Sequence, residues 1–594
     1  MKNSENILDI KESVLKKSWV IRPQDENKIL AIKSKYKIPD LIVRILMNRG
    51  VRSNDIEYYL NPTLKHSMPD PYVLIDMDKS CNRIKQAIVN NEKIGIIGDY
   101  DVDGAVSTSV LYKYLNSLSN IVHTHIPDRI KEGYGPSVDS IKMLIKKGVT
   151  LLISVDCGTS SNDIFKSIES NIDIIVLDHH QPSEFLPDVY AVVNPNRLDD
   201  SSGLGFLCAS GVVFLTLVAL NRILREDKYF NNIKEPNLLN YLQLIAMATI
   251  TDVVPLVGLN RALVHQGLKL INKNMNEGLK AIAGHSSIYG EINAYHFGYV
   301  FGPRINAGGR IGKSDLGLRL LIADDPVDAD SLAFELNELN LERQRLESQY
   351  LDEAITCYES KENSFDSSIV FVSSKNWHPG VIGIIASRLV ERYNKPALVM
   401  TYSTITKAYT GSGRSVKGFD LGLAVKEAYA SNLLVKGGGH EMAAGFTVKE
   451  DNLSNLEYFF NKLIHNDIIE IKQKNKSTII DSILVASGAN VTLVEWINKL
   501  EPFGNSFRSP RFIFISHKIS YIKIIGDSHL KLTISSFEGK AIEAIAFRAI
   551  STPLGDALLS SKDKKIHFIG KLNINEWNGR KIVQLIIEDI AYPN

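Results

Sequence analysis

The chain has 594 residues, more than a single hydrophobic core usually supports, so we expect several domains. With 44% hydrophobic and 23% charged residues, its composition is that of a globular protein and excludes a disordered or fibrous one. The formal net charge of +1 neither supports nor excludes a nucleic-acid partner, because basic residues can line one groove of a neutral protein.

Several features of the sequence argue against secretion and membrane insertion. The N-terminal stretch is polar and mixed in charge, unlike a signal peptide, and the longest uncharged apolar run, residues 207–220, is too short to span a bilayer. The four cysteines show no CxxC pairing, so neither a zinc knuckle nor a disulfide framework is indicated. We therefore expect a cytoplasmic protein without membrane association.

Residues 1–72 form a predicted helical lead-in without a catalytic motif. From residue 73 to about 258, apolar strand-like runs alternate with helical stretches. This alternation predicts an α/β fold with a doubly wound, largely parallel sheet that has helices on both faces. The predicted strands cover residues 93–97, 121–126, 150–155, 173–177 and 191–193.

The stretch GDYDVDG follows the first of these strands and precedes a helical pattern over residues 105–118. It brings the carboxylates of Asp99, Asp101 and Asp103 to one strand-to-helix turn. Like charges at this spacing repel one another, so the cluster persists most easily when divalent cations neutralise it. The alternative is that one aspartate caps the helix while the others are solvated turn residues.

Further acidic and histidine residues stand at the ends of later elements. Parallel sheets bind ligands outside the carboxyl ends of their strands, so these side chains are expected to converge on GDYDVDG. Carboxylate oxygens and imidazole nitrogens suit manganese or magnesium. The residues are Asp156 after the third strand, Asp178, His179 and His180 after the fourth, and Asp252 after an apolar helix over 242–250.

The pattern between residues 276 and 362 is helical. Apolar residues at helical spacing over 332–350 predict a long linking helix that packs on both neighbours. The stretch FGPRINAGGR precedes this helix. Its paired glycines let the backbone approach a ligand closely, and Arg304 and Arg310 supply forked donors for phosphate.

A second, smaller α/β unit is predicted over residues 363–470. Its GSGRS stretch stands where a strand gives way to a turn, and there the Ser412 hydroxyl and the Arg414 guanidinium suit a terminal phosphate. The GGGH run allows close backbone approach, with His440 as a donor. Strands are predicted over residues 369–372, 397–400 and 407–410, with a helix over 381–391.

After residue 476, five short stretches alternate apolar and polar residues as half-buried strands do. Five such strands predict a small barrel of the OB type, a fold that commonly binds single strands. The segment LEPFGNSFRSPRF opens this region. Its aromatic and basic residues, Phe503, Phe507, Arg508 and Arg511, either form a stacking and charge platform or, in the case of the phenylalanines, belong to the core.

Eight stretches, in this order and spacing, resemble the motifs of a known family. GDYDVDG, VDCG, DHH and TDVV resemble motifs of the DHH phosphoesterase superfamily, and FGPRINAGGR, WHPGVIGIIASRL, GSGRS and GGGHEMAAG resemble those of its RecJ family of single-strand-specific exonucleases. The resemblance runs from about residue 40 to the C-terminus. It implies a DHH catalytic domain, a DHH-associated domain and an OB domain.

The resemblance implies roles for the residues at the strand ends. Asp101, Asp103, Asp156, His179 and Asp252 match the metal ligands of two divalent cations, with Asp156 bridging, and Asp99 stands beside them. His180 matches the residue that faces the scissile phosphate, and Asp178 is expected to orient a histidine ring. Many relatives have a histidine where this chain has Ile97, so one cation is expected to have fewer ligands.

The resemblance also implies contacts to the DNA strand. Arg129, which otherwise reads as a surface arginine in a turn, matches a contact to the DNA backbone. His378 either lies in the substrate cleft or caps the helix that follows it. The remaining implied contacts are Arg304, Asn306, Arg310, Ser412, Arg414, Gly438 and His440.

We therefore expect a metal-dependent 5′-to-3′ exonuclease that degrades single-stranded DNA in repair and recombination, as a monomer with a helicase and a single-strand-binding protein as possible partners. Two alternatives stay open: a small-substrate phosphoesterase acting on oligoribonucleotides, nucleotide phosphates or pyrophosphate, and a metal-free single-strand-binding scaffold. The expected domains are residues 1–72, 73–275, 276–362, 363–470 and 476–594.

Overall fold

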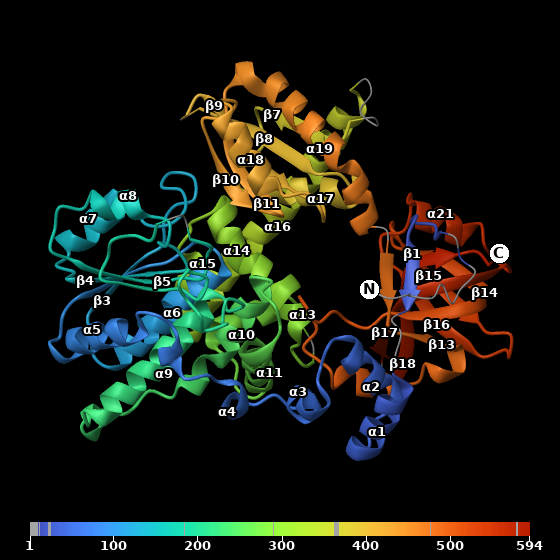
Figure 1. Ribbon diagram of the computed structural model, residues 1–594, viewed down its shortest axis with the longest axis horizontal. Helices are drawn as coiled ribbons and strands as arrows, with labels where there is room; N and C mark the ends of the chain where they lie inside the picture. The colour runs from blue at the N-terminus through green and yellow to red at the C-terminus, as the bar shows by residue number, and fades with distance from the viewer. Residues whose placement is uncertain are drawn as a thin grey trace. The chain divides into compact units, whose positions relative to one another are not determined.

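The computed structural model describes residues 10–593 except 11, 22–24, 183–184, 289, 362–366, 405, 476 and 578–579. The chain divides into two compact units, which are traced by residue colour in Figure 1. The larger unit comprises residues 62–466 and 504–506, and the smaller comprises residues 1–61, 467–503 and 507–594. Every predicted metal ligand lies in the larger unit, whereas the residues of the predicted stacking platform, Phe503, Phe507, Arg508 and Arg511, lie in the smaller one.

A five-stranded parallel sheet forms the first part of the larger unit. Its strand order is β3-β2-β4-β5-β6, and every neighbouring pair is parallel, as the alternation of strand and helix patterns predicts. The strands are β2 (Ile94–Ile97), β3 (Val122–His125), β4 (Leu151–Val155), β5 (Asp173–Leu177) and β6 (Ala191–Val193).

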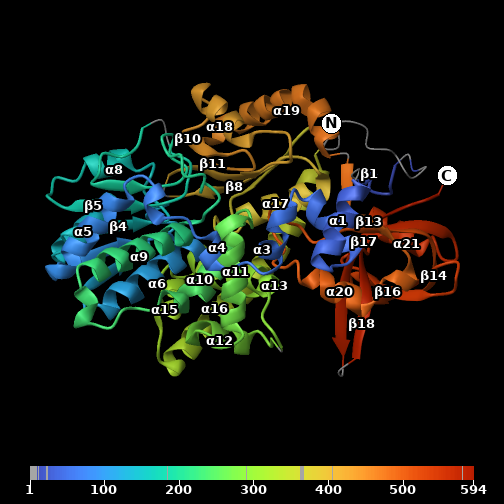
Figure 2. The ribbon, with the colours of Figure 1, turned by 60° about the horizontal axis from the view of Figure 1, so that its bottom comes forward.

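Helices cover both faces of this sheet, which confirms the doubly wound fold. Side chains from alternate strand positions, such as Ile96 and Ile153, join one apolar core with α5, α6 and α9, whereas Ile97 and Leu152 join another with α7 and α8. Figures 1 and 2 show these two groups of helices on opposite sides of the strands. The helices are α5 (Met77–Val89), α6 (Val102–Ser117), α7 (Val138–Lys146), α8 (Asn162–Lys166) and α9 (Ala209–Glu226).

A mainly helical segment joins this sheet to a second one. It ends in α16 (Pro326–Glu359), the predicted long helix, which begins where the Asp325 side chain accepts a hydrogen bond from the Val327 N–H. Its other helices are α10 (Leu242–Thr251), α11 (Gly258–Ile271), α12 (Glu277–His285), α13 (Ala294–His296), the π-helix η5 (Phe297–Phe301), α14 (Gly302–Ile311) and α15 (Leu316–Ile322). Helix α4 (Leu64–Ser67), which precedes the first sheet in the chain, contacts α11.

The second sheet has the order β10-β11-β9-β8-β7. The pair β7–β8 is parallel and the other pairs are antiparallel, so β10 is an edge strand. The GGGH run forms this edge strand, which the sequence patterns did not predict. The elements are β7 (Val370–Ser374), α17 (Ile382–Tyr393), β8 (Ala397–Ser403), β9 (Ala408–Arg414), α18 (Leu421–Ala430), β10 (Lys436–His440), β11 (Ala443–Val448) and α19 (Leu453–Asn475).

The smaller unit contains a closed five-stranded barrel, as predicted. Strands pair in the order β14-β15-β16-β18-β17, and β17 pairs back onto β14. Phe507 is 3% exposed and belongs to the core of this unit, so the core alternative holds for it rather than the stacking platform. The elements are β12 (Ser477–Ile480), β13 (Ser482–Leu484), α20 (Val491–Asn498), β14 (Phe512–Ile525), β15 (His529–Ser535), β16 (Ala541–Ala546), α21 (Pro553–Leu559), β17 (Lys565–Trp577) and β18 (Arg580–Ala591).

The N-terminal segment packs on this barrel. Strand β1 (Ser18–Ile21) pairs in parallel with β12, and the Trp19 indole N–H donates to Asp589 Oδ2 at 3.3 Å. Ile29 and Ile42 are fully buried in the same core as Phe512 of the barrel. The helices of this segment are α1 (Glu26–Tyr36), α2 (Asp40–Asn48) and α3 (Ile56–Leu60). Among the described residues, no helix is both long and apolar enough to cross a membrane.

Candidate active site

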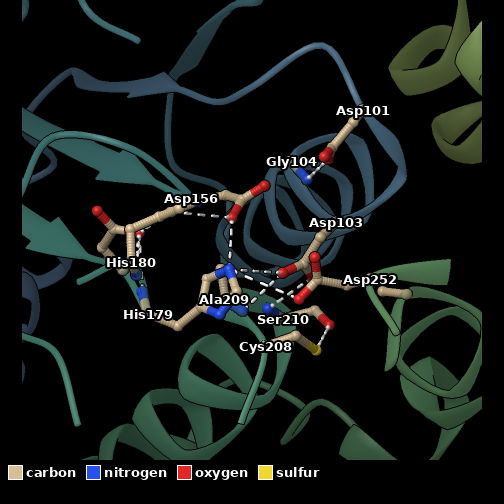
Figure 3. A network of polar contacts seen from close by, with 12 residues as sticks. Asp101, Asp103, Gly104, Asp156, His179, His180, Cys208, Ala209, Ser210 and Asp252 are labelled. Atoms are coloured by element: carbon tan, nitrogen blue, oxygen red, sulfur yellow. Dashed lines mark hydrogen bonds and ion pairs between the residues drawn. The ribbon is translucent and has the colours of Figure 1, made fainter. Parts of the chain in front are cut away.

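The predicted metal ligands gather where strands β2, β4 and β5 end. Asp99 follows β2, Asp156 follows β4, and His179 follows β5, so the parallel sheet brings them to one edge. Asp252 reaches the same place as the C-cap of α10. Figure 3 shows Asp103, Asp156 and Asp252 pointing toward the His179 ring.

Helix α6 begins earlier than its apolar pattern predicts, and this fixes two of the aspartates. Asp101 is the N-cap, and its Oδ1 accepts a hydrogen bond from the Gly104 N–H at 3.1 Å. Asp103 therefore stands in the first turn, where its carboxylate accepts hydrogen bonds from the N–H groups of Ala209 (2.6 Å) and Ser210 (3.0 Å). The capping alternative thus holds for Asp101 alone, and the other two carboxylates are buried rather than solvated.

His179 is the centre of the cluster. Its Nε2 lies 3.3 Å from Asp156 Oδ1, 3.6 Å from Asp252 Oδ2 and 3.9 Å from Asp103 Oδ2. A second group of ligand atoms within 4.8 Å of one another comes from Asp99, Asp101 and Asp156. Asp156 therefore contributes to both groups.

Several buried atoms of the cluster lack a hydrogen-bond partner among the described residues. They are Asp99 Oδ1, Asp156 Oδ1, His179 Nε2 and Asp252 Oδ2. Buried polar atoms of proteins are nearly always satisfied, so four orphaned atoms aimed at one place need a ligand. Oxygen atoms with one imidazole nitrogen are the donor set that manganese or magnesium takes, and the residues present fit such ions.

The electrostatics of the cluster also favour a cation. Burial, followed by the charge of Asp103, raises the pKa of Asp156 and of Asp252 well above its usual value. Burial and then Asp101 do the same to the pKa of Asp99. Burial lowers the pKa of His179, which keeps the imidazole in the neutral form that ligates metals. A divalent cation would offset the cost of burying these carboxylates.

His180 lies at the side of this cluster, with Nδ1 3.9 Å from Asp156 Oδ1, and it pairs with Asp178. Its Nδ1 lies 2.8 Å from Asp178 Oδ1, and the buried Asp178 carboxylate also accepts hydrogen bonds from the N–H groups of Thr159 and His179. Burial opposes the charge of His180, but the bond to Asp178 raises the pKa of the imidazole to about 9. Burial likewise opposes the charge of Asp178, yet the bond to His180 holds the pKa of this carboxyl well below its usual value.

Two glycines let helix α14 lie against the metal cluster on one side and the WHPG loop on the other. A Cβ on Gly309 would lie 2.6 Å from the Tyr100 carbonyl oxygen, and a Cβ on Gly380 would lie 2.1 Å from the Arg310 carbonyl oxygen. Neither contact leaves room for a side chain. The close packing places Arg310 between GDYDVDG and the second sheet.

Arginines from three separate segments meet around α14. Burial, followed by the charges of Arg129, Arg343 and Arg414, lowers the pKa of Arg310 to about 10. Burial and then Arg129 lower the pKa of Arg414 and of His378. The Arg129 guanidinium lies 5.0 Å from the centre of the Tyr100 ring. Positive charges gathered at one place in this way attract phosphate groups.

The structure places the other predicted contacts as follows. Ser412 Oγ accepts a hydrogen bond from Arg414 Nη1 at 3.2 Å. His378 Nδ1 accepts one from the Gly380 N–H at 3.1 Å, in the loop before α17, whose N-cap Val381 has no side-chain cap, so His378 does not cap that helix. Arg304 donates to Asn337 Oδ1 and to the Val300 carbonyl. Asn306 is partly exposed on α14, whereas Gly438 and His440 lie on the edge strand β10, and no hydrogen bond among the described residues joins these three to the metal cluster.

Three residues of the site were missed from the sequence. The Tyr134 hydroxyl lies 2.9 Å from the Asp156 carbonyl and 3.1 Å from His180 Nδ1. Asn194 and Asn196 donate to the carbonyls of His180 and His179 and so hold the DHH segment. Both asparagines follow β6, so the strand-end rule that identified the aspartates applies to them as well.

Comparisons with known proteins agree with this architecture. Family models match three segments: "DHH family, N-terminal domain" at residues 93–249, "DHHA1 domain" at 366–466 and "RecJ OB domain" at 480–589. Ile97, the position at which the sequence resemblance implied one metal ligand fewer, is fully buried in the apolar core beside α7.

Relatives match over almost the whole chain. The single-stranded-DNA-specific exonuclease RecJ of Bacillus subtilis (strain 168) is 33% identical over 97% of this chain and 71% of its own length. RecJ of Escherichia coli (strain K12) is 31% identical over 93% of this chain and 96% of its own. The crystal structure of Thermus thermophilus RecJ in complex with Mn2+ has a TM-score of 0.80 and 25% identity, covering 97% of this chain and 79% of that one. The chain therefore belongs to the RecJ family of single-stranded-DNA-specific exonucleases.

Proposed function

We propose that this chain hydrolyses single-stranded DNA from its 5′ end with the help of two divalent cations, manganese or magnesium. The observation that carries the proposal is the convergence of His179 with the carboxylates of Asp103, Asp156 and Asp252, within the fold of a family of exonucleases. The Thermus thermophilus relative, whose solved structure contains Mn2+, supports the choice of ion.

Two groups of residues would hold the cations. Asp103, Asp156, His179 and Asp252 would hold one, and Asp99, Asp101 and Asp156 the other. Asp156 belongs to both groups, which suits a bridging ligand. Bound cations would polarise the phosphate and lower the pKa of water toward neutrality.

The protein's own residues would bind and orient the scissile phosphate. With its pKa raised to about 9, His180 carries a proton at neutral pH and can donate to a phosphate oxygen. Asp178 holds the ring in place through Nδ1, and the Tyr134 hydroxyl lies beside the same nitrogen. Arg129 and Arg310 would bind neighbouring phosphates, with Arg304, Asn306, Gly438 and His440 as further contacts to the strand.

A nest for the 5′ phosphate would explain the direction of cleavage. Ser412, Arg414 and the first turn of α17 lie together, because a Cβ on Gly383 would be 3.0 Å from Ser412 Oγ and 3.2 Å from Arg414 Nη2. A helix N-terminus and an arginine both attract phosphate. Burial and then the charge of Arg129 lower the pKa of His378, and the same arginine lowers the pKa of Arg414, so Arg129 is near both residues.

Two alternatives have less support. A small-substrate phosphoesterase would need the two sheets alone, whereas residues 480–589 match the RecJ OB domain. A metal-free scaffold would have no use for four orphaned ligand atoms at one place.

The free cysteines fit the cytoplasmic setting that we propose for the protein. A helicase and a single-strand-binding protein fit as partners of a monomer that consumes single strands.

The first test of the proposal compares substrates and ions. We expect Mn2+ to activate hydrolysis of 5′-labelled single-stranded DNA, EDTA to abolish it, and blunt duplex, short RNA and pyrophosphate to be poor substrates. Preferred hydrolysis of pyrophosphate or short RNA would instead establish the small-substrate alternative. Binding of single strands without any hydrolysis would establish the scaffold.

The second test concerns polarity. Arg414→Ala should reduce cleavage of a 5′-phosphorylated strand about tenfold or more, since a charge-assisted bond contributes ~1.5–3 kcal/mol. A 5′-hydroxyl strand should lose much less. Arg345→Ala is the matched control, because Arg345 is exposed on α16 and pairs with Glu342. Equal losses on both substrates would place Arg414 elsewhere along the strand.

A further inference from the structure

Two exposed tyrosines stack on each other just before α14. Tyr295 is 61% exposed and Tyr299 is 71% exposed, and their ring centres are 4.9 Å apart with planes inclined by 25°. Large aromatic rings are normally buried, because burying their apolar area is favourable. A stacked pair left in water offers a flat aromatic surface to a ligand.

The backbone that carries this pair is firmly held. Residues 294–311 form one uninterrupted helical run, α13–η5–α14, which begins with a capping box between Asn293 and His296. Phe297 and Phe301, from the same run, are fully buried in the main core. The middle of the run is a π-helix, a distortion that occurs frequently at functional sites. The tyrosines are therefore presented on a fixed support.

A cation is anchored to the backbone one residue beyond Tyr299. Arg304 Nη1 donates to the carbonyl of Val300, the residue that follows Tyr299, so the guanidinium lies one turn before its own Cα. Its Nε donates to Asn337 Oδ1 of α16. Burial and then Arg343 lower the pKa of Arg304, so a second cation is near. An aromatic surface beside an arginine is the combination that takes a base and its phosphate.

The same helical run leads to the metal cluster. Its far end carries Gly309, which packs against the Tyr100 carbonyl inside GDYDVDG. Tyr299 and Arg310 are eleven residues apart, about 16 Å along a helix. Stacked nucleotides are ~3.4 Å apart, so the pair would meet about the fifth nucleotide from the cleaved end, or an earlier one if the strand is extended.

We propose that Tyr295 and Tyr299, with Arg304, form a distal subsite that stacks a base of single-stranded DNA several nucleotides from the reacting phosphate. This inference rests on the proposed exonuclease function and adds to it a place where the uncleaved strand is held. The occupant is a nucleobase because the surface is flat, aromatic and flanked by a cation, and because it continues the row of proposed phosphate contacts on α14.

The experiment uses the full chain with Mn2+ and a 5′-phosphorylated 20-mer whose first linkages are phosphorothioates that resist hydrolysis. A single 2-aminopurine is moved through positions 2–10, since its fluorescence is quenched by stacking. We expect the parent to show extra quenching centred near positions 3–5. Tyr295→Ala combined with Tyr299→Ala should abolish that quenching and weaken binding of the strand about fivefold or more.

Two further variants control for the aromatic rings themselves and for the loss of an exposed tyrosine elsewhere. Tyr295→Phe combined with Tyr299→Phe retains both rings and should preserve the quenching. Tyr458→Ala, at a tyrosine 70% exposed on α19, is the matched control and should change nothing. All variants should keep the parent's thermal midpoint, because the side chains are exposed.

The outcomes separate the subsite from the function on which it rests. If the parent hydrolyses unmodified single strands but shows no position-specific quenching, or if the double alanine variant keeps it, the subsite is overturned and the exonuclease stands. If the parent does not hydrolyse DNA, both fall. Unchanged DNA binding by the double alanine variant, together with loss of binding to a protein partner, would overturn the DNA subsite in favour of a protein-docking surface.

Discussion

Asp156 combines backbone strain with charge repulsion. Its φ of +59° lies in the left-handed region that few residues other than glycine, asparagine and aspartate adopt readily. Its carboxylate is 2% exposed and faces the charges of Asp103, Asp101 and Asp99. Strained residues persist where function requires them, so Asp156 is the carboxylate that we expect to be least dispensable.

Asp156→Asn is the first prediction at this scale, because asparagine also tolerates the left-handed region. Hydrolysis should fall well over tenfold, and the affinity for Mn2+, measured by titration calorimetry, should fall with it. The metal-free thermal midpoint should rise by about 1–3 °C, since a neutral amide removes the repulsion. Asp352→Asn, at an exposed aspartate of α16, is the control and should leave all three unchanged.

The same change should alter the pH dependence of stability. A carboxyl whose pKa is raised in the folded state contributes stability at low pH that is lost as pH rises from 3.8 toward the raised value. The metal-free midpoint should therefore fall with rising pH in the parent and fall less in Asp156→Asn. Activity within tenfold of the parent after metal reconstitution, or a lowered metal-free midpoint, would contradict the bridging role.

How much of the site could be predicted depends on what sets each position. Asp99, Asp156 and His179 follow parallel strands, so strand order alone brings them together. Arg310 could not be placed in this way, because its position depends on packing at Gly309 and Gly380 that leaves no periodic signal. Tyr134 was missed because a tyrosine in a turn carries no pattern of its own.

Among the elements, helix α17 is the one whose N-terminus lies at the proposed site for the 5′ phosphate. Its apolar period predicted the helix, but the sequence does not indicate what its N-terminus faces. The structure places Gly383, in its first turn, beside Ser412 and Arg414. The edge strand β10 was missed for a similar reason, because a run of glycines has low strand propensity and only its pairing with β11 makes it a strand.

Gly383→Ala is the prediction at this scale. Replacing glycine by alanine at a helical position lowers the conformational entropy of the unfolded chain and stabilises by about 0.4–1 kcal/mol, so the thermal midpoint should stay level or rise. The new methyl group would crowd Ser412 Oγ and Arg414 Nη2, so the preference for a 5′-phosphorylated over a 5′-hydroxyl strand should fall about threefold or more.

Gly284→Ala provides the matched control for this change. Gly284 lies in α12, and a Cβ there would meet nothing within 4 Å. It should stabilise its helix equally without affecting the preference for a 5′ phosphate. If Gly383→Ala keeps the full preference, the 5′ phosphate binds away from the start of α17.

At the scale of the whole molecule, the segments that fold together are not those that follow one another. The five strands of the barrel were predictable from alternation, but the packing of residues 26–60 against it was not, because an amphipathic helix does not encode which core it joins. A chain cut before residue 476 would leave Ile29 and Ile42 without their partners. Exposing each buried isoleucine costs ~1.5–3 kcal/mol, so that truncation should aggregate.

Residues 62–466 are therefore the truncated chain to test. It should hydrolyse short strands but bind long ones more weakly. The logarithm of its binding constant should fall less steeply with the logarithm of the salt concentration, by ~0.7 in slope for each phosphate that it no longer binds. Asn505→Ala in the full chain is the control, because the Asn505 side chain donates to the Val253 carbonyl at 2.7 Å beside Asp252 and would also be missing from the truncated chain. Unchanged affinity for long strands would make the barrel a protein-docking module.

The parallel pairing of β1 with β12 has a consequence for synthesis. Residues 18–21 leave the ribosome roughly 460 residues before their partners at 477–480, a delay of about 20–90 s at ordinary elongation rates. The nuclease core, formed almost entirely by the contiguous residues 62–466, can fold during that interval. The N-terminal segment cannot, so Trp19 and Ile29 stay exposed to chaperones until the barrel is complete. If synthesis stops during this interval, the product is a folded nuclease core whose N-terminal segment exposes apolar residues and lacks its partner strand.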